Sequence, residues 1–269
     1  MTAGDRRRLA SYRVGLALPA LLLPLAVGCA TARPPGSSRE AVLQQILPAS
    51  VQIIIERDGR RFRSASGTVI AAEPTAEGVD CYVLTSGHAF ARRVDGDRVS
   101  ILLDRQAGPG TPVPATVLAV QYADRVDLAL LKIAAPRCAV ATLGDPPALG
   151  EDVFVVAFPW GRNMTLVGGM VSQVNRDEAP DPEVAPRLMI DASVSYGSSG
   201  GGVYVARTGR LIGLIEGYRT AHVSFEVATQ PGHVEIPVPG ETYVTPLAQI
   251  RRFLDSVGYG ALLTTAARP

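Results

Sequence analysis

Residues 191–201 read Asp-Ala-Ser-Val-Ser-Tyr-Gly-Ser-Ser-Gly-Gly and place a serine in a glycine-rich turn. Glycine adopts backbone conformations that a Cβ would resist, so such a turn can direct N–H groups toward a neighbouring carbonyl. Ser199 has the frame Gly-x-Ser-Gly-Gly and is the candidate nucleophile. Ser195 and Ser198 compete with it, but neither has this frame in register.

A serine hydroxyl is a poor nucleophile by itself, so it needs a base and an orienting carboxylate from elsewhere in the chain. Residues 82–90, Tyr-Val-Leu-Thr-Ser-Gly-His-Ala-Phe, place His88 just after an apolar run typical of a strand. Asp127 opens a second such run, Asp-Leu-Ala-Leu-Leu-Lys-Ile. Asp124 competes less well because it lies outside that motif. We therefore expect His88 to be the base and Asp127 the carboxylate.

In the order His88, Asp127, Ser199, these segments resemble those of trypsin-like serine peptidases, most closely the bacterial HtrA/Deg branch. The resemblance spans roughly residues 47–259. It includes three further segments: Leu-Gly-Asp at 143–145, Ala-Phe-Pro-Trp-Gly at 157–161 and Gly-Met-Val-Ser at 169–172. Two positions depart from the branch, which usually has Asn where Ser198 stands and Pro where Gly202 stands. Because the sequence ends at Pro269, we expect no PDZ domain after the peptidase segment.

Short apolar runs separated by turn residues favour an all-β fold. The resemblance implies two packed six-stranded antiparallel β-barrels of the chymotrypsin type, at 39–145 and 146–262, followed by a tail at 263–269. Helical patterns appear at 39–46, before Pro48, and at 246–257, before Gly258. Asp58-Gly59 predicts a hairpin turn. The expected strand runs are 51–55, 67–71, 99–103, 117–120, 128–133, 153–158, 166–174, 187–190, 202–205 and 211–215.

The same resemblance implies serine endopeptidase chemistry without a cofactor or metal. The backbone N–H groups of Gly197 and Ser199 would form the oxyanion hole. Ser193, six residues before Ser199, would lie at the base of the primary pocket, where the lack of an acid argues for an apolar or small substrate residue rather than Lys or Arg. The pocket wall would come from Leu214, Ile215 and Glu216.

The N-terminus has the pattern of an export signal. Arg6, Arg7 and Arg8 precede an apolar stretch at 14–27, which is too short to cross a bilayer as a helix. Small residues before Cys29 resemble a bacterial lipobox, so we expect a lipoprotein signal at 1–28, a lipidated Cys29 and a flexible tether at 29–38. Ordinary cleavage near Ala32 is the alternative. The protein would then be exported to the cell envelope, anchored in a membrane and facing the periplasm.

Composition limits the partners. The formal net charge is +1 and the basic excess lies at the N-terminus, so no basic patch indicates nucleic acid binding. The expected partners are protein or peptide substrates of the envelope and, by the resemblance, further copies of the chain. With Cys29 lipidated, Cys81 and Cys138 are left as a pair, which an oxidising compartment would join in a disulfide. Two buried thiols are the alternative.

Two other functions fit part of the pattern. Residues 197–201 also satisfy Gly-x-Ser-x-Gly, the nucleophile elbow of α/β-hydrolase esterases, with His222 or His233 and Glu226 or Asp255 as partners. No helical pattern follows Ser199, which argues against that fold. The second alternative is a peptidase-like domain that binds extended peptides without turnover, because Tyr196 and Glu216 could block the site.

Overall fold

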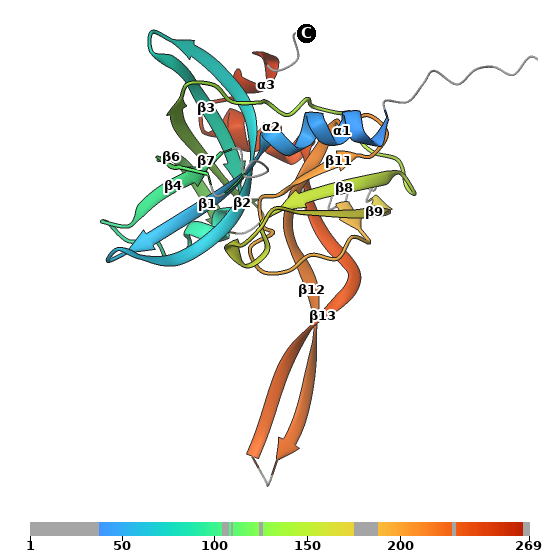
Figure 1. Ribbon diagram of the computed structural model, residues 1–269. Coiled ribbons are helices and arrows are strands. Elements are labelled where there is room, and N and C mark those ends of the chain that lie inside the picture. The colour runs from blue at the N-terminus through green and yellow to red at the C-terminus, as the bar shows by residue number, and fades with distance from the viewer. Residues whose placement is uncertain are drawn as a thin grey trace, which may run out of the picture. The chain divides into compact units, whose positions relative to one another are not determined.

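Antiparallel strands make up most of the structure (Figure 1), a computed structural model that describes residues 38–103, 108, 110–123, 126–174, 188–227 and 230–265. The first sheet has the order β5-β4-β1-β2-β3-β7-β6, and the second closes into a barrel in the order β10-β13-β12-β11-β8-β9. The all-β class of the chymotrypsin type is confirmed. The first sheet differs in having seven strands, because the short β5 pairs with the outer side of β4.

The first sheet ends at Ala135 and the barrel begins at Asp152. The first sheet consists of β1 (Ser50–Arg57), β2 (Arg60–Thr75), β3 (Gly78–Thr85), β4 (Arg98–Leu102), β5 (Pro112–Pro114), β6 (Thr116–Ala123) and β7 (Val126–Ala135). The barrel consists of β8 (Asp152–Ala157), β9 (Thr165–Val174), β10 (Leu188–Ile190), β11 (Gly202–Val205), β12 (Leu211–Val227) and β13 (Gln230–Pro246). The helices and 3₁₀ turns are α1 (Arg39–Ile46), η1 (Leu47–Ala49), η2 (Gly87–Phe90), η3 (Pro159–Gly161), α2 (Leu247–Ser256) and α3 (Leu262–Thr265).

Side chains that point alternately to the two faces of each strand form three hydrophobic cores. In β8, Val153 and Val155 point into the barrel, while Phe154 and Val156 point toward a cluster shared by both sheets. This is the period of two expected of a strand with both faces buried. The first sheet has its own core around residues such as Ile53 and Leu131. Burying each of these aliphatic side chains contributes about 1.5–3 kcal/mol, so the shared cluster fixes the two sheets against each other.

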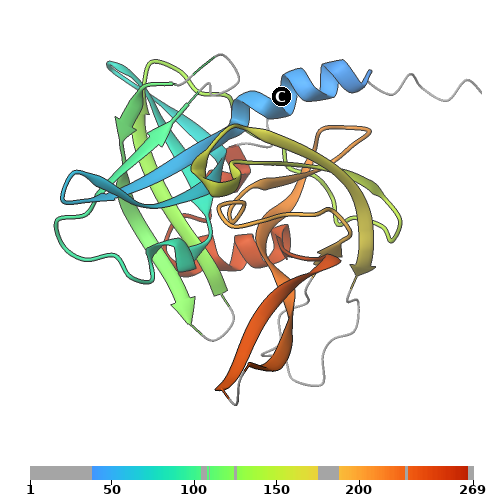
Figure 2. The same cartoon turned by 60° about the horizontal axis from the view of Figure 1, so that its bottom comes forward.

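Both helices predicted from the sequence are present, and they close the shared cluster. α1 starts after Ser38, whose Oγ accepts a hydrogen bond from the Ala41 N–H, and it buries Val42 and Ile46. α2 follows Pro246 and packs against β7 of the first sheet and against β12 and β13 of the barrel. Figure 2 shows α2 in red lying across both sheets. None of the described helices is long and apolar enough to cross a membrane.

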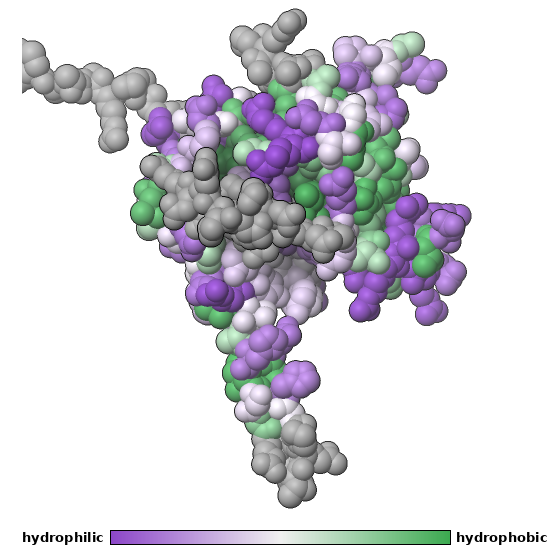
Figure 3. Space-filling model, turned by 180° about the vertical axis from the view of Figure 1, so that it is seen from behind, coloured by the Kyte–Doolittle hydropathy of each residue, from purple (hydrophilic) through white to green (hydrophobic). Residues whose placement is uncertain are grey.

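The β12–β13 hairpin projects well beyond the barrel (Figure 1), which the sequence did not predict because its expected strand stopped at Ile215. One face of the projecting part carries Val223, Phe225, Val234 and Ile236, all exposed. Figure 3 shows this apolar surface in green on the hairpin. The other face is polar and carries His222 opposite Glu235. Apolar and polar residues alternate in 221–225 and 234–236, and this pattern could have predicted the two strands of the hairpin.

A disulfide joins Cys81 of β3 to Cys138, which follows β7. Cys81 is fully buried in the first core. The bridge closes a loop with a sequence separation of 57 residues, which in the chain-entropy model stabilises the fold by about 4 kcal/mol. It links the strand before His88 to the end of the strand that begins near Asp127, so it also braces the supports of both residues.

Candidate active site

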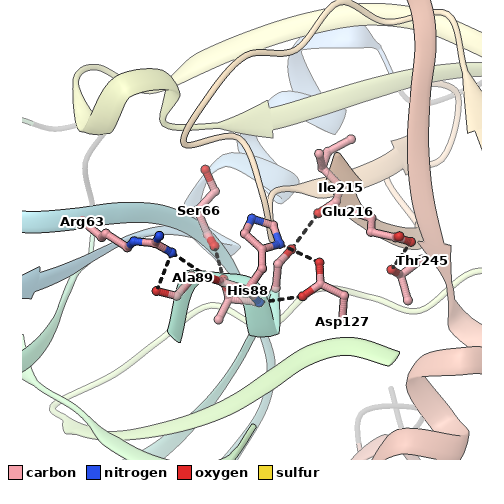
Figure 4. A network of polar contacts seen from close by, with 10 residues as sticks. Arg63, Ser66, His88, Ala89, Asp127, Ile215, Glu216 and Thr245 are labelled. Carbon is pink, nitrogen blue, oxygen red and sulfur yellow. Dashed lines mark hydrogen bonds and ion pairs between the residues drawn. The ribbon is translucent and has the colours of Figure 1, made fainter. Parts of the chain in front are cut away.

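His88 and Asp127 form a close pair at the edge of the first sheet (Figure 4). His88 lies on η2, directly after β3, and Asp127 lies near the start of β7, which pairs with β3. His88 Nδ1 lies 2.6 Å from Asp127 Oδ2, and the His88 backbone N–H donates to Asp127 Oδ1 at 2.6 Å. Because both carboxylate oxygens hold the same residue, the carboxylate fixes the ring's position and leaves its Nε2 to face outward.

The turn that carries His88 is held from two sides. Arg63 Nη1 donates to the His88 carbonyl at 2.7 Å (Figure 4). At Gly87, an added Cβ would lie 2.2 Å from the carbonyl oxygen of Gln121. Only glycine allows η2 to approach β6 this closely. Packing within the first sheet therefore helps to place His88.

An ion pair between half-buried Arg57 and buried Asp97 closes the loop that follows η2. Arg57 Nε and Nη2 donate to the two oxygens of Asp97, each at 2.8 Å, and Nη2 also donates to the Arg92 carbonyl. The Val94 N–H donates to Asp97 Oδ2 at 3.0 Å. The hydrogen bonds from Arg57 and then from Val94 lower the pKa of Asp97 from 3.8 to about 2. The folded state therefore favours the charged carboxylate.

We expect Asp97→Asn to lower the thermal unfolding midpoint at pH 7. Because the folded pKa of Asp97 lies below its ordinary value, the stabilisation is fully present above about pH 4 and is lost as the pH falls toward 2. Thermal unfolding followed by circular dichroism at several pH values measures the difference from wild type. Asp95→Asn, an exposed change in the same loop, is the control. If the difference in thermal unfolding midpoint between wild type and Asp97→Asn did not become smaller at acid pH, this role would be contradicted.

Ser199 lies at a tight turn before β11 whose backbone needs glycine. Gly197 has φ +89° and Gly200 has φ +82°, and a Cβ on Gly200 would lie 2.3 Å from the Ser66 carbonyl oxygen. Among the described residues, the N–H groups of Gly197 and Ser199 donate to no acceptor within the chain. Two free donors in one turn are what an oxyanion hole requires. Ser198 is buried, and its Oγ accepts from the Ser195 N–H, so its hydroxyl faces its own turn.

Buried serines on β2 and just before η2 hold this turn and the neighbouring strand β12, a feature that sequence reasoning missed. Ser66 Oγ donates to the Gly197 carbonyl at 2.7 Å, and the Ser66 N–H donates to the Ser199 carbonyl at 3.0 Å. Ser86, just before η2, donates to the Ile215 carbonyl at 3.0 Å. These contacts span more than 100 residues of sequence, so no local spacing could have revealed them. They bring the two sheets together at the site.

His88 and Ser199 line one pocket of about 320 Å³ between the sheets. Within the described contacts no hydrogen bond joins them, and such bonds often tighten only when substrate binds. The remaining lining residues are Val194, Ser195, Tyr196, Ile215, Glu216, Gly217, Tyr218, Thr220 and Glu235.

The structure places two of the four predicted pocket residues along this pocket. Ile215 and Glu216 line the pocket, whereas Ser193 and Leu214 do not. Leu214 is buried in the shared core, and Ser193 is exposed. A β-bulge between Ile215 and Gly217 turns the chain here, and bulges redirect side chains in ways that residue counting misses. The preference for an apolar or small substrate residue, predicted from Ser193, stays a prediction, and two glutamates, Glu216 and Glu235, line this pocket.

Three aromatic rings follow one another beside the pocket. Trp160 and Tyr196 meet edge to face with centroids 5.2 Å apart, and Tyr196 meets Tyr218 at 6.0 Å. Burial and then a hydrogen bond with Tyr196 raise the pKa of Tyr218 to about 12, so its hydroxyl stays neutral. Trp160 has φ +56°, a conformation that non-glycine residues rarely adopt. Its N–H donates to the Tyr196 carbonyl at 2.7 Å, so the strained residue directly supports the turn before Gly197.

The esterase alternative does not fit the fold. A nucleophile elbow leads from a strand into a helix, whereas Ser199 leads into strand β11. His222 and His233 lie on the projecting hairpin and are exposed, and neither lines the pocket of Ser199. Asp255 lies on α2, and the side chain of Glu226 is outside the described residues, as are Asp124, Cys29 and the whole segment 1–37.

Known proteins resemble the chain in both sequence and fold. A family model for the trypsin-like peptidase domain matches residues 65–214, more than half of the chain. A probable periplasmic serine endoprotease, DegP-like, of Brucella suis is 32% identical over 167 residues, covering 58% of this chain and 30% of that protein. A DegP-like relative of Marinomonas is 29% identical over 151 residues, covering 55% of this chain and 28% of that protein. The chain thus spans about 30% of these relatives.

Solved structures share the fold at lower sequence identity. The serine endoprotease from Yersinia pestis matches with a TM-score of 0.59 at 20% identity, over 82% of this chain and 66% of that chain. An HtrA-type protease determined with a tripeptide gives a TM-score of 0.59 at 20% identity, over 82% of this chain and 63% of that one. These likenesses concern the arrangement of the strands.

Proposed function

The chain belongs to the family of trypsin-like peptidases, which are serine hydrolases, and from this premise we propose that it is a serine endopeptidase with Ser199 as nucleophile. The observation that carries the proposal is the short His88–Asp127 pair beside a turn whose Ser199 lines the same pocket. The N–H groups of Gly197 and Ser199, which have no acceptor among the described residues, support it further. No cofactor has a role in the chemistry proposed.

The first half of the reaction forms an acyl-enzyme. Ser199 Oγ attacks the substrate carbonyl carbon as its proton passes to His88 Nε2. Asp127 accepts a hydrogen bond from Nδ1–H, which fixes the tautomer and stabilises the imidazolium. The oxyanion accepts hydrogen bonds from the N–H groups of Gly197 and Ser199. The C–N bond then breaks, His88 gives its proton to the leaving amine, and the acyl group stays on Ser199.

The second half frees the enzyme. Water enters in place of the amine and passes a proton to His88 Nε2 as its oxygen attacks the acyl carbon. The same two N–H groups bind the second oxyanion. The bond between Ser199 Oγ and the acyl carbon breaks, the proton returns to Oγ, and a carboxylic acid leaves. Each half uses the same three side chains.

Hydrolysis of an unfolded protein tests the activity itself. We expect purified residues 38–269 to fragment β-casein and Ser199→Ala, at matched concentration, to leave it intact. The comparison excludes a contaminating peptidase, because contamination would be the same in both preparations. Casein that bound to the wild-type chain but stayed intact would instead support the binding-only alternative and contradict the proposal.

Envelope proteins are the proposed substrates, and the cell envelope the proposed location. Two relatives are named periplasmic serine endoproteases, and the basic and apolar N-terminal pattern supports export of this chain. Lipidation of Cys29 would anchor the enzyme in a membrane. Fractionation of cells expressing wild type and Cys29→Ala tests this: equal membrane association of both would contradict the anchor.

Assembly of several copies is proposed from the resemblance, and light scattering of the purified protein would test it.

A further inference from the structure

Ser66 of β2 places all of its polar atoms at the candidate active site. Its side chain is fully buried. Its Oγ accepts a hydrogen bond from the Phe158 N–H at 2.8 Å and donates one to the Gly197 carbonyl at 2.7 Å. Its N–H donates to the Ser199 carbonyl, and its carbonyl accepts from Thr85 Oγ1 at 2.7 Å. One residue of the first sheet therefore contacts two separate loops of the barrel.

Those two loops together orient the Gly197 N–H. The peptide that carries this N–H has the Tyr196 carbonyl at its other end, and that carbonyl accepts from the Trp160 N–H. In a trans peptide the C=O and N–H point in opposite directions, so holding the Tyr196 carbonyl on Trp160 turns the Gly197 N–H the other way. Phe158, which Ser66 holds, lies two residues before Trp160 in the same loop.

Removing the Ser66 hydroxyl would take one hydrogen-bond partner from each of the two loops. The Phe158 N–H and the Gly197 carbonyl are bridged by a single oxygen, and Phe158 and Ser66 are both fully buried. A buried donor or acceptor without a partner is costly, so the loops would move to find new ones. Any such movement changes where the Gly197 N–H points, since Gly197 already has a φ of +89° that glycine can leave freely.

We propose that Ser66 is a positioning residue that holds the oxyanion hole open by joining the Phe158–Gly161 loop to the turn before Ser199. The inference rests on the proposed function, because it assigns Ser66 to the same reaction. It acts through Gly197 and does not touch the substrate. Its effect therefore falls on the transition state, where the oxyanion exists, and leaves binding of the ground state unchanged.

Ser66→Ala is expected to lower kcat about 10-fold to 100-fold, less than the loss of an oxyanion donor itself, with KM changed less than about twofold. The affinity for a peptide boronate, whose tetrahedral adduct occupies the oxyanion hole, should fall by a similar factor. The affinity for the product peptide should not change. Ser50→Ala is the matched control, since it removes an equally buried serine hydroxyl whose described partners, the Ile46 carbonyl and the Tyr204 hydroxyl, include neither Phe158 nor Gly197.

A wild-type kcat and boronate affinity in Ser66→Ala would overturn the role of Ser66 while leaving the proposed function intact. Equal losses in Ser66→Ala and Ser50→Ala would show a merely structural effect and would also overturn it. If Ser66→Ala does not fold, Ser66→Cys carries the same test, because sulfur keeps the volume and bonds only weakly; a wild-type kcat there overturns the proposal. Failure of the proposed function looks different, since the wild-type chain itself would then show no turnover.

Discussion

His88→Ala is expected to lower kcat about 10⁶-fold, because removing the base leaves Ser199 with its proton. The structure gives Ser199 one histidine in its pocket among the described residues, and that is His88. His222→Ala and His233→Ala should keep the wild-type kcat, since both side chains are exposed on the hairpin outside the pocket. Hydrolysis of a chromogenic peptide ester, measured for all three variants, gives the comparison.

His222→Ala and His233→Ala are matched controls, because they show the effect of losing a histidine outside the pocket. They remove the same ring from the same chain without touching the His88–Asp127 pair. A large loss of kcat in either of them, with His88→Ala near wild type, would contradict the assignment of the base. Equal thermal unfolding midpoints would show that His88→Ala had not simply unfolded.

Asp127→Asn is expected to lower kcat about 10⁴-fold with little change in stability. Asp127 accepts hydrogen bonds from both the backbone N–H and Nδ1 of His88, each at 2.6 Å. The amide of asparagine has only one accepting oxygen, so it cannot satisfy both. If the amide nitrogen faces the ring, it donates to Nδ1 and forces the proton onto Nε2. That tautomer cannot accept the proton of Ser199.

Proton NMR separates this mechanism from general damage. A carboxylate-bound Nδ1–H gives a far-downfield resonance, which we expect in wild type and not in Asp127→Asn. Asp145→Asn, an exposed change outside the site, should keep both the resonance and the wild-type kcat. Loss of activity in Asp127→Asn with the resonance retained would show that the tautomer is not the cause.

The sequence was informative where chemistry depends on local order. His88 follows a strand and Asp127 lies near the start of one, and those strands, β3 and β7, pair directly in the sheet. The glycine frame of Ser199 corresponds to a turn with two left-handed glycines. Apolar runs and terminal helices were equally readable, because each depends on a period of a few residues. These features needed no knowledge of how distant segments meet.

The pocket and its supports could not be read in this way. The lining around Glu216 depends on a β-bulge, which shifts the side chains relative to a simple count. Ser66 contributes through contacts across 92 and 131 residues of sequence. Tyr218 and Glu235 join the pocket because β12 and β13 continue past the barrel as a long hairpin. Each of these depends on register or on long-range packing, neither of which follows from residue type and spacing.

Mass spectrometry of the chain after reaction with a fluorophosphonate tests the central claim most directly, because it identifies the nucleophile by the atom that becomes modified. We expect a single adduct, mapped by peptide fragmentation to Ser199 and absent from His88→Ala. The neighbouring hydroxyls serve as internal controls, since Ser195 lines the same pocket and Ser198 is adjacent in sequence. An adduct on Ser195 or Ser198, or one that persisted in His88→Ala, would contradict the claim that His88 activates Ser199.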